Sequence, residues 1–243
     1  MYATETLIEH WRRFSPDKKP YLHPADAPHV FDPKNFEFDL LPYPFVGDIA
    51  GADVWVLMLN SNIGHRDELD EEDPLFRERQ RANLRQDFRG LDYPLLSLDP
   101  VLRGTGTYQY YNVRNGFHDL IDVYGTRAGI PTEDARKAIA RRVAVLQLLP
   151  YRSKSGQYVE KMSGVMPSSR LVYRAVQEAV SLKHKLVVVP RSAPLWGLKY
   201  EQNIDGRIIT YRADQARSGS LKPSSAGGRC AGGNAIISWL LEQ

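Results

Sequence analysis

Two side chains suited to hydrolysis, or to the recognition of a planar polar ligand, follow one apolar run. Asn60 and His65 come directly after residues 54–59. An Asn side chain can orient a water molecule or hydrogen-bond the edge of a base. A His can act as an acid, a base or a neutral donor near pH 7. We therefore predict that Asn60 and His65 are catalytic; otherwise Asn60 caps the next element and His65 is solvated. The small and polar residues between them are candidate ligand contacts: Ser61, Asn62 and Gly64.

Three further polar loops follow apolar runs and carry groups that suit a phosphate or a base. In the second loop Tyr151 stands beside Arg152, and an aromatic ring next to a cation favours a stacked base. In the third loop Arg191 can hold a phosphate through paired hydrogen bonds. The fourth loop, residues 212–225, is rich in glycine and hydroxyl groups and can press its backbone against a sugar-phosphate chain. The candidate contacts on these loops are Tyr151, Arg152, Ser153, Arg191, Ser192, Arg217, Ser218, Ser220 and Leu221.

Each of these features also has an interpretation without a ligand. Tyr151 can simply cover a strand end, and Leu221 is either an apolar wedge that enters a base stack or a buried anchor. The acidic run 67–73 can bind a divalent ion, but a solvated helix start whose dipole matches its acids is favoured. Because the histidines are scattered and no phosphate-loop or dinucleotide-binding motif is present, we expect no metal site and no cofactor.

The elements that must position these loops alternate between strands and helices. Alternation of this kind predicts parallel strands with right-handed crossovers and helices on both faces. The expected fold is a three-layer α/β sandwich around a central four-stranded parallel sheet, with all four loops at one edge. Apolar runs place the strands at 53–59, 143–149, 185–189 and 207–211. Amphipathic patterns place the main helices at 1–14, 70–89, 114–124, 132–142, 167–182 and 234–241.

Length and composition favour one ordinary globular domain. The 243 residues fit a single α/β domain, 1–243, with a proline- and aromatic-rich arm at 15–51 and an insertion at 90–131. The net charge of +3 permits an anionic partner without requiring one. A single cysteine, Cys230, excludes a disulfide within the chain and indicates a cytoplasmic location. No apolar run approaches the roughly 20 residues of a membrane span, so we expect no membrane partner.

Taken together, these features resemble the uracil-DNA glycosylase superfamily, whose fold is a four-stranded parallel sheet between helices. Residues 57–64, Leu-Met-Leu-Asn-Ser-Asn-Ile-Gly, are similar to its first motif, an apolar strand followed by Asn-Pro-Gly. Residues 218–221 are the candidate for its second motif. The resemblance implies that Asn60 positions the attacking water and that Leu221 displaces the base. Ser61 replaces the family's Pro, no Asp stands beside Asn60, and the second motif contains no His.

Two functions therefore remain open for the sequence. The first is a DNA glycosylase-like enzyme that flips a base and hydrolyses its N-glycosidic bond. There Asn60 would orient the water, Arg152, Arg191 and Arg217 would hold phosphates, and an aromatic residue of the arm or of 108–111 would stack on the base. The second is a catalytically silent module that binds nucleic acid or a modified nucleotide, which the missing Asp and His favour. DNA is the expected partner of both, and a small-molecule hydrolase on the same fold is a third possibility.

Overall fold

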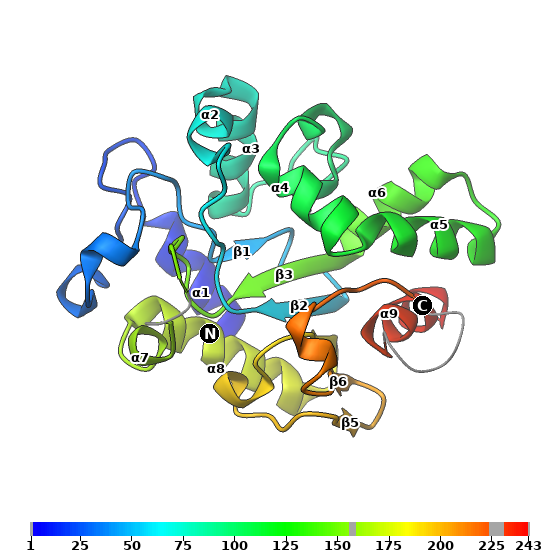
Figure 1. Cartoon of the computed structure of the whole chain (residues 1–243). Coiled ribbons are helices and arrows are strands. Elements are labelled where there is room, and N and C mark those ends of the chain that lie inside the picture. The colour runs from blue at the N-terminus through cyan, green and yellow to red at the C-terminus, as the bar shows by residue number, and fades with distance from the viewer. Residues whose placement is uncertain (1, 156–158, 224–230, 243) are drawn as a thin grey trace.

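The computed structural model describes residues 2–155, 159–223 and 231–242. Over these residues the sheet has six strands in the order β1-β3-β2-β4-β6-β5 (Figure 1). The four inner strands pair in parallel, whereas β1 and β5 pair antiparallel with their neighbours at the two edges. The predicted four-stranded parallel sheet is thus corrected to a six-stranded mixed sheet. The strands are β1 Phe45–Val46, β2 Val54–Met58, β3 Val143–Gln147, β4 Leu186–Val189, β5 Asn203–Ile204 and β6 Ile208–Thr210.

The two edge strands were missed for different reasons. Strand β1 has only two residues, which is too short for any periodic pattern to reveal it. Strand β5 forms a hairpin with β6 through Asp205 and Gly206, and both turn residues have positive φ angles. An Asp-Gly pair is a strong hairpin signal, because type I′ turns require that backbone conformation. The sequence therefore contained the information for β5, but not for β1.

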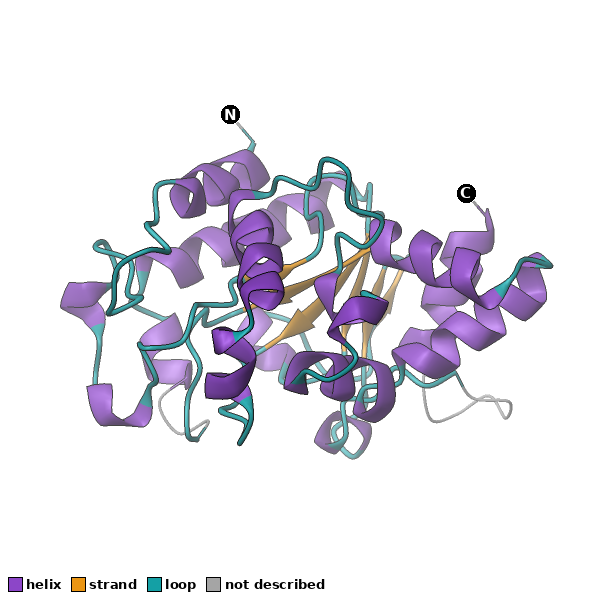
Figure 2. Ribbon diagram, turned by 90° about the horizontal axis from the view of Figure 1, so that it is seen from above, coloured by secondary structure: helices purple, strands orange, loops and turns teal. Residues whose placement is uncertain are grey.

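Helices cover both faces of the sheet, which is why β2, β3 and β4 are buried throughout (Figure 1). Helices α1 and α8 pack together on one face, and α5 packs against α6 and α9 on the other. Seen from above, the strands lie at the centre of the molecule (Figure 2). The α-helices are α1 Ala3–Arg12, α2 Asp67–Glu72, α3 Pro74–Arg85, α4 Gly106–Tyr108, α5 Phe117–Ala128, α6 Thr132–Arg142, α7 Val159–Ser163, α8 Pro167–Leu182 and α9 Ala231–Glu242.

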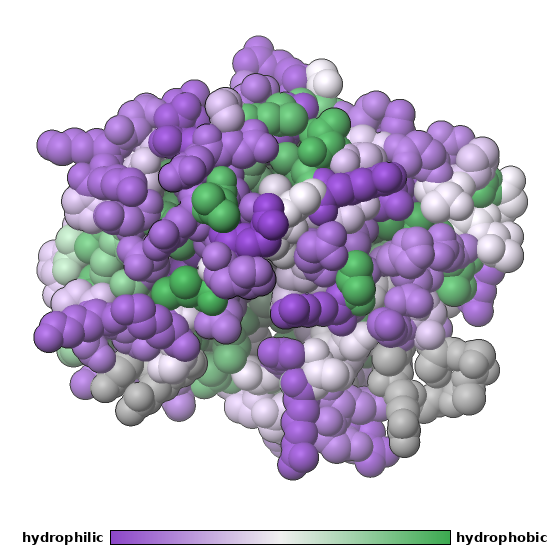
Figure 3. All heavy atoms as spheres, turned by 45° about the horizontal axis from the view of Figure 1, so that its top comes forward, coloured by the Kyte–Doolittle hydropathy of each residue, from purple (hydrophilic) through white to green (hydrophobic). Residues whose placement is uncertain are grey.

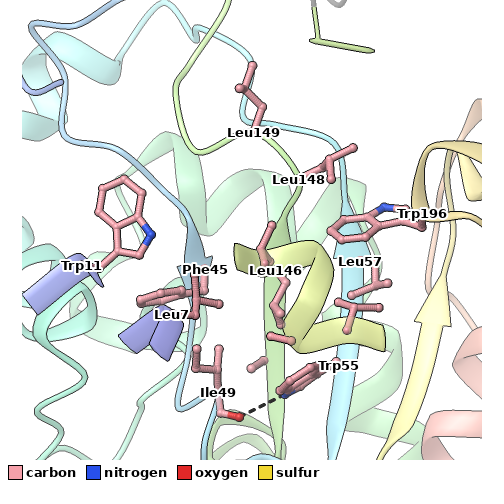
Figure 4. Packing of buried hydrophobic residues seen from close by; sticks show 14 of the residues in the cluster. Leu7, Trp11, Phe45, Ile49, Trp55, Leu57, Leu146, Leu148, Leu149 and Trp196 are labelled. Atoms are coloured by element: carbon pink, nitrogen blue, oxygen red, sulfur yellow. Dashed lines mark hydrogen bonds between the residues drawn. The ribbon is translucent and has the colours of Figure 1, made fainter. Parts of the chain in front are cut away.

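Alternating residues of β2 point into two separate cores. Trp55 and Leu57 belong to the cluster under α1 and α8, whereas Val54 and Val56 belong to the cluster on the opposite face. Figure 4 shows the first cluster, in which the Trp55 indole N–H donates to the Ile49 carbonyl oxygen at 3.2 Å. The alternation of β2 side chains between two apolar clusters explains why the whole strand reads as a continuous apolar run.

Several helix boundaries agree with the sequence patterns, and two segments differ. Helices α6 and α8 match the predicted 132–142 and 167–182. The predicted helix 70–89 is two helices, because Pro74 begins α3 and the Asp73 side chain caps it by accepting from two backbone N–H groups. Between α4 and α5 the chain forms a π-helical segment, Gln109–Arg114. Short 3-10 helices lie at Ala27–His29, Pro33–Asn35, Leu96–Leu98, Pro100–Leu102, Ala193–Trp196 and Gln215–Arg217.

The arm at 15–51 lies against the sheet rather than extending into solvent. Its side chains Tyr21, Phe36 and Phe45 are buried in the cluster under α1 and α8. Within the part of the chain that is described, no helix is long and apolar enough to cross a membrane. The same residues contain no group of three or more His, Cys, Asp or Glu side chains arranged to hold a metal ion. Cys230 lies outside the described residues.

Candidate functional site

A cavity of about 750 Å³ lies beyond the carboxyl ends of β2 and β3. The last residues of these strands, Met58 and Gln147, contribute to its wall, together with the loop after β2 and the π-helical segment. The face in Figure 3 is mostly hydrophilic, with isolated apolar groups between the polar ones. The structure brings to this cavity the following residues predicted from the sequence: Asn60, Ser61, Asn62, Gly64, His65, Arg152 and Arg191.

The loops after β2 and β3 continue the parallel pairing beyond the strands and so fix Asn60. The Ser153 N–H donates to the Ser61 carbonyl oxygen at 3.2 Å, and Asn62 forms a parallel bridge with Ser153. The Asn60 side-chain amide donates to the Ser153 hydroxyl at 2.6 Å and to the Ser61 carbonyl at 3.1 Å. Oδ1 of Asn60 receives no hydrogen bond from the described residues, so it can accept one from a water or a ligand.

Tyr151 has a different place from the one predicted. Its side chain is 1% exposed and packs under the arm. Its hydroxyl donates to Oδ2 of Asp26 at 2.7 Å and accepts from the His23 N–H at 3.1 Å. The ring packs against Trp11 and Phe38, so in this structure it is not placed to stack on a base in the cavity. Ser153 also does not line the cavity. Its hydroxyl instead accepts a hydrogen bond from the Asn60 side chain.

Arg152 is buried in the cavity wall among groups of opposite charge. It forms an ion pair with Asp67, lies 4.0 Å from the Glu71 carboxylate and covers the Tyr43 ring at 4.8 Å. Burial raises the pKa of Glu71, and the charge of Arg152 partly offsets that rise. Because its charge is already balanced inside the protein, Arg152 positions the cavity wall rather than offering a free cation to a phosphate.

The acidic run 67–73 begins helix α2 as its sequence favoured, with Glu68, Glu72 and Asp73 exposed, but the other acids of the run are not solvated. Asp67, Asp70 and Glu71 are all buried. Oδ2 of Asp67 accepts from the Gly64 N–H at 2.7 Å, and Oδ2 of Asp70 accepts from the Gly106 N–H at 2.6 Å. These carboxylates hold the loop after β2, helix α2 and the start of α4 together. Oδ1 of Asp67 accepts no hydrogen bond from the described residues and belongs to a side chain that lines the cavity.

The third and fourth loops meet at Arg191. Its Nη2 donates to the Ser218 carbonyl oxygen at 2.6 Å. Gly219 has φ +57°, and a Cβ there would collide with the Arg191 side chain, so only a glycine lets the fourth loop lie this close. Ser192 has a left-handed conformation and begins the short helix 193–196, away from the cavity lining.

Leu221 is a buried anchor, not an exposed wedge. Its side chain is 0% exposed and packs with the core on the face covered by α5 and α9. Its N–H donates to the Asn115 carbonyl oxygen at 2.6 Å. Ser220 is half-buried and does not line the cavity, and its backbone carbonyl accepts from the Tyr211 hydroxyl at 2.8 Å. Arg217 and Ser218 are exposed but do not line the cavity, and residues 224–225 of this loop lie outside the described residues.

Gln147 and the π-helical segment were not assigned as site residues from the sequence. Gln147 ends β3, is 2% exposed and donates to the Tyr111 hydroxyl at 3.3 Å. Its Oε1 atom is buried without a hydrogen-bond partner among the described residues. The sequence signal that could have identified Gln147 is its position as a polar residue at the end of the apolar run 143–147, Val-Ala-Val-Leu-Gln. The rings of Tyr110 and Tyr111 meet edge to face at 5.0 Å, and both line the cavity, within the 108–111 stretch named as one source of a stacking ring.

The π-helical segment is held in place from both sides. Asn112 donates to the Ser97 carbonyl at 2.6 Å and accepts from buried Arg136 at 3.2 Å. Single π turns inside helices are frequent at functional sites, since the extra residue redirects side chains. Burial raises the pKa of Tyr110, and the charge of Arg191, which lines the same cavity, opposes that rise.

Compared with protein-family models, with curated proteins and with solved structures, the chain matches none of them.

Proposed function

We propose that the cavity binds one nucleobase, carried by a nucleotide. This proposal rests mainly on the side chain of Gln147. Its side chain is almost fully buried, yet one polar atom of its amide has no partner among the described residues. A buried polar atom without a hydrogen bond costs about 1–3 kcal/mol, and among such atoms in the described residues this one belongs to a side chain that lines the cavity. A planar ligand that hydrogen-bonds the amide would remove this cost.

The rest of the cavity suits the remainder of a nucleotide. A volume of about 750 Å³ is in the range of small-molecule sites, which is roughly 300–1,000 Å³. Tyr110, which is only partly buried, offers a ring on which a base can stack. Arg191 lines the same cavity and supplies positive charge for a phosphate, whereas Arg66, which also lines it, pairs with the Asp70 carboxylate at 3.8 Å. DNA remains the expected source of the nucleotide.

Hydrolysis of the N-glycosidic bond is the second candidate, and Asn60 and Asp67 favour it. Both side chains line the cavity, and Oδ1 of each accepts no hydrogen bond from the described residues. Two acceptors of this kind can hold and orient one water molecule through its two protons. His65 lines the same cavity and is exposed to solvent. With this reaction the protein would be a DNA glycosylase-like enzyme.

The test of base binding is calorimetry with a panel of deoxynucleoside monophosphates carrying uracil, hypoxanthine, xanthine, cytosine or a modified cytosine. We expect one of them to bind, and Gln147→Leu to weaken it about 5- to 150-fold, which is the effect of 1–3 kcal/mol. Gln177→Leu, on α8 and outside the cavity lining, is the matched control and should bind as the unaltered protein does. Equal binding by both variants, or no binding of any nucleotide, would refute the proposal.

A further inference from the structure

Three arginines without carboxylate partners stand beside the cavity, one on each of three segments. Arg114 ends the π-helical segment, Arg191 lies on the loop after β4, and Arg217 ends the short helix 215–217. None of the three forms an ion pair with any described residue, although Arg191 donates to a backbone carbonyl. Many other surface arginines do have carboxylate partners, among them Arg13, Arg81, Arg89, Arg141 and Arg212.

Two side-chain-to-backbone hydrogen bonds and one backbone hydrogen bond join these three segments. Asn115, the residue after Arg114, donates from its side chain to the Gly219 carbonyl at 3.0 Å, and its own carbonyl accepts from the Leu221 N–H at 2.6 Å. Arg191 donates to the Ser218 carbonyl, next to Arg217, at 2.6 Å. These hydrogen bonds make the three segments neighbours, and we call their arginines, Arg114, Arg191 and Arg217, the arginine strip. Two of them, Arg114 and Arg191, also line the cavity.

An exposed apolar side chain accompanies the strip. Val113 is 57% exposed and lines the cavity next to Arg114. One nucleoside monophosphate carries a single phosphate group and can engage at most part of a set of three cations. A strand that continues beyond the bound nucleotide brings a phosphate for each arginine, and a neighbouring sugar or base for Val113.

We propose that the arginine strip binds successive phosphates of a nucleic-acid strand while one base of that strand occupies the cavity. The ligand is then a polynucleotide rather than a free nucleotide. This inference rests on the proposed function for the base, but it concerns different residues. Arg217 lies outside the cavity lining and contributes only if the ligand extends beyond it.

The experiment compares a fluorescent single-stranded DNA oligonucleotide with a nucleoside monophosphate of the same base, over a range of salt concentrations. Three phosphate contacts on a single strand predict a slope of about −2 for log affinity against log salt. Arg114→Gln and Arg217→Gln should each reduce that slope by about 0.7 and weaken oligonucleotide binding several-fold at low salt. Arg174→Gln, an exposed charge on α8, is the matched control and should change neither quantity.

The outcomes distinguish phosphate binding by the arginine strip from base binding in the cavity. The mononucleotide should bind more weakly than the oligonucleotide, and Arg217→Gln should leave mononucleotide binding within about 2-fold of the unaltered protein. Equal affinities for the two ligands, or arginine variants that behave like Arg174→Gln, would overturn the strip and leave base binding standing. Oligonucleotide binding that needs the strip but not Gln147 would keep the strip and overturn the base cavity. Binding of neither ligand overturns both.

Discussion

The side-chain amide of Asn60 donates a hydrogen bond to the hydroxyl of Ser153, with the two atoms 2.6 Å apart. The residues lie 93 positions apart, on the loops after the adjacent strands β2 and β3. The Ser153 hydroxyl itself donates to the Ser155 carbonyl at 2.8 Å, so it must accept from Asn60. This polarity fixes which atom of the amide is the nitrogen, and it leaves Oδ1 of Asn60 for a water or a ligand.

Ser153→Ala tests this relationship. If Asn60 orients a water for N-glycosidic hydrolysis, we expect Asn60→Ala to abolish the formation of alkali-labile abasic sites in oligonucleotides. Ser153→Ala should lower kcat about 10-fold with KM little changed, because the amide is then free to rotate. The loss of stability should be about 1 kcal/mol. Ser163→Ala on α7 is the control. Full activity of Ser153→Ala would contradict the positioning role, and full activity of Asn60→Ala would contradict the assignment of Asn60.

Arg152 should be essential for stability rather than for phosphate binding. Arg152→Met leaves the buried carboxylates of Asp67 and Glu71 without their cation. Breaking a buried ion pair in this way typically costs 3–5 kcal/mol. Urea denaturation of the variant should show a loss of that size, whereas exposed Arg174→Gln should stay within about 0.5 kcal/mol of the unaltered protein. A loss below about 1 kcal/mol for Arg152→Met would show that the cluster does not hold the cavity wall.

Leu221→Ala distinguishes an anchor from a wedge. The side chain is fully buried, so its truncation should destabilise the fold by about 2–5 kcal/mol. The comparison is Val113→Ala at the exposed rim of the cavity, which should change stability by less than about 0.5 kcal/mol. Thermal denaturation of both variants measures the difference. Unchanged stability of Leu221→Ala, with weaker DNA binding, would restore the wedge interpretation.

The stacked imidazoles of His10 and His23 should make the fold sensitive to acid. Their ring centroids are 3.8 Å apart. Burial, and secondarily the charge of His23, lower the pKa of His10 from 6.5 to about 4. The folded state therefore favours the neutral ring, and this contribution is complete above pH 6.5 and is lost as the pH falls toward 4. The loss should be smaller than the roughly 3 kcal/mol of the full shift, because the ring is partly exposed to solvent.

The measurement is Tm at pH 7 and at pH 4.5. His10→Phe keeps a ring for stacking but removes one group that must gain a proton, so its Tm should fall less between the two pH values. His118→Gln, which replaces an exposed imidazole on α5, should lose as much Tm as the unaltered protein. An equal fall in Tm for all three proteins would show that His10 does not contribute to acid sensitivity.

Local sequence determined the inner strands, most helices and the loop that carries Asn60. Continuous apolar runs such as 54–59 predict strands buried on both faces, and the 3.6-residue spacing of apolar side chains predicts helices such as α8. These signals depend on neighbours within a few residues, so a single sequence contains them in full. The Asp205–Gly206 turn was of the same kind, although the hairpin it forms was not predicted from it.

Tertiary structure alone decided which polar residues of each loop reach the cavity. Tyr151 and Arg152 are adjacent, yet Tyr151 hydrogen-bonds Asp26 of the arm while Arg152 pairs with Asp67 of α2. Those partners lie 125 and 85 positions away along the chain, and no local pattern contains them. The same holds for Leu221, whose burial depends on the core under α5 and α9. A polar loop residue acquires its role from distant side chains, because charge pairing and burial are set by position in space and not by order in sequence.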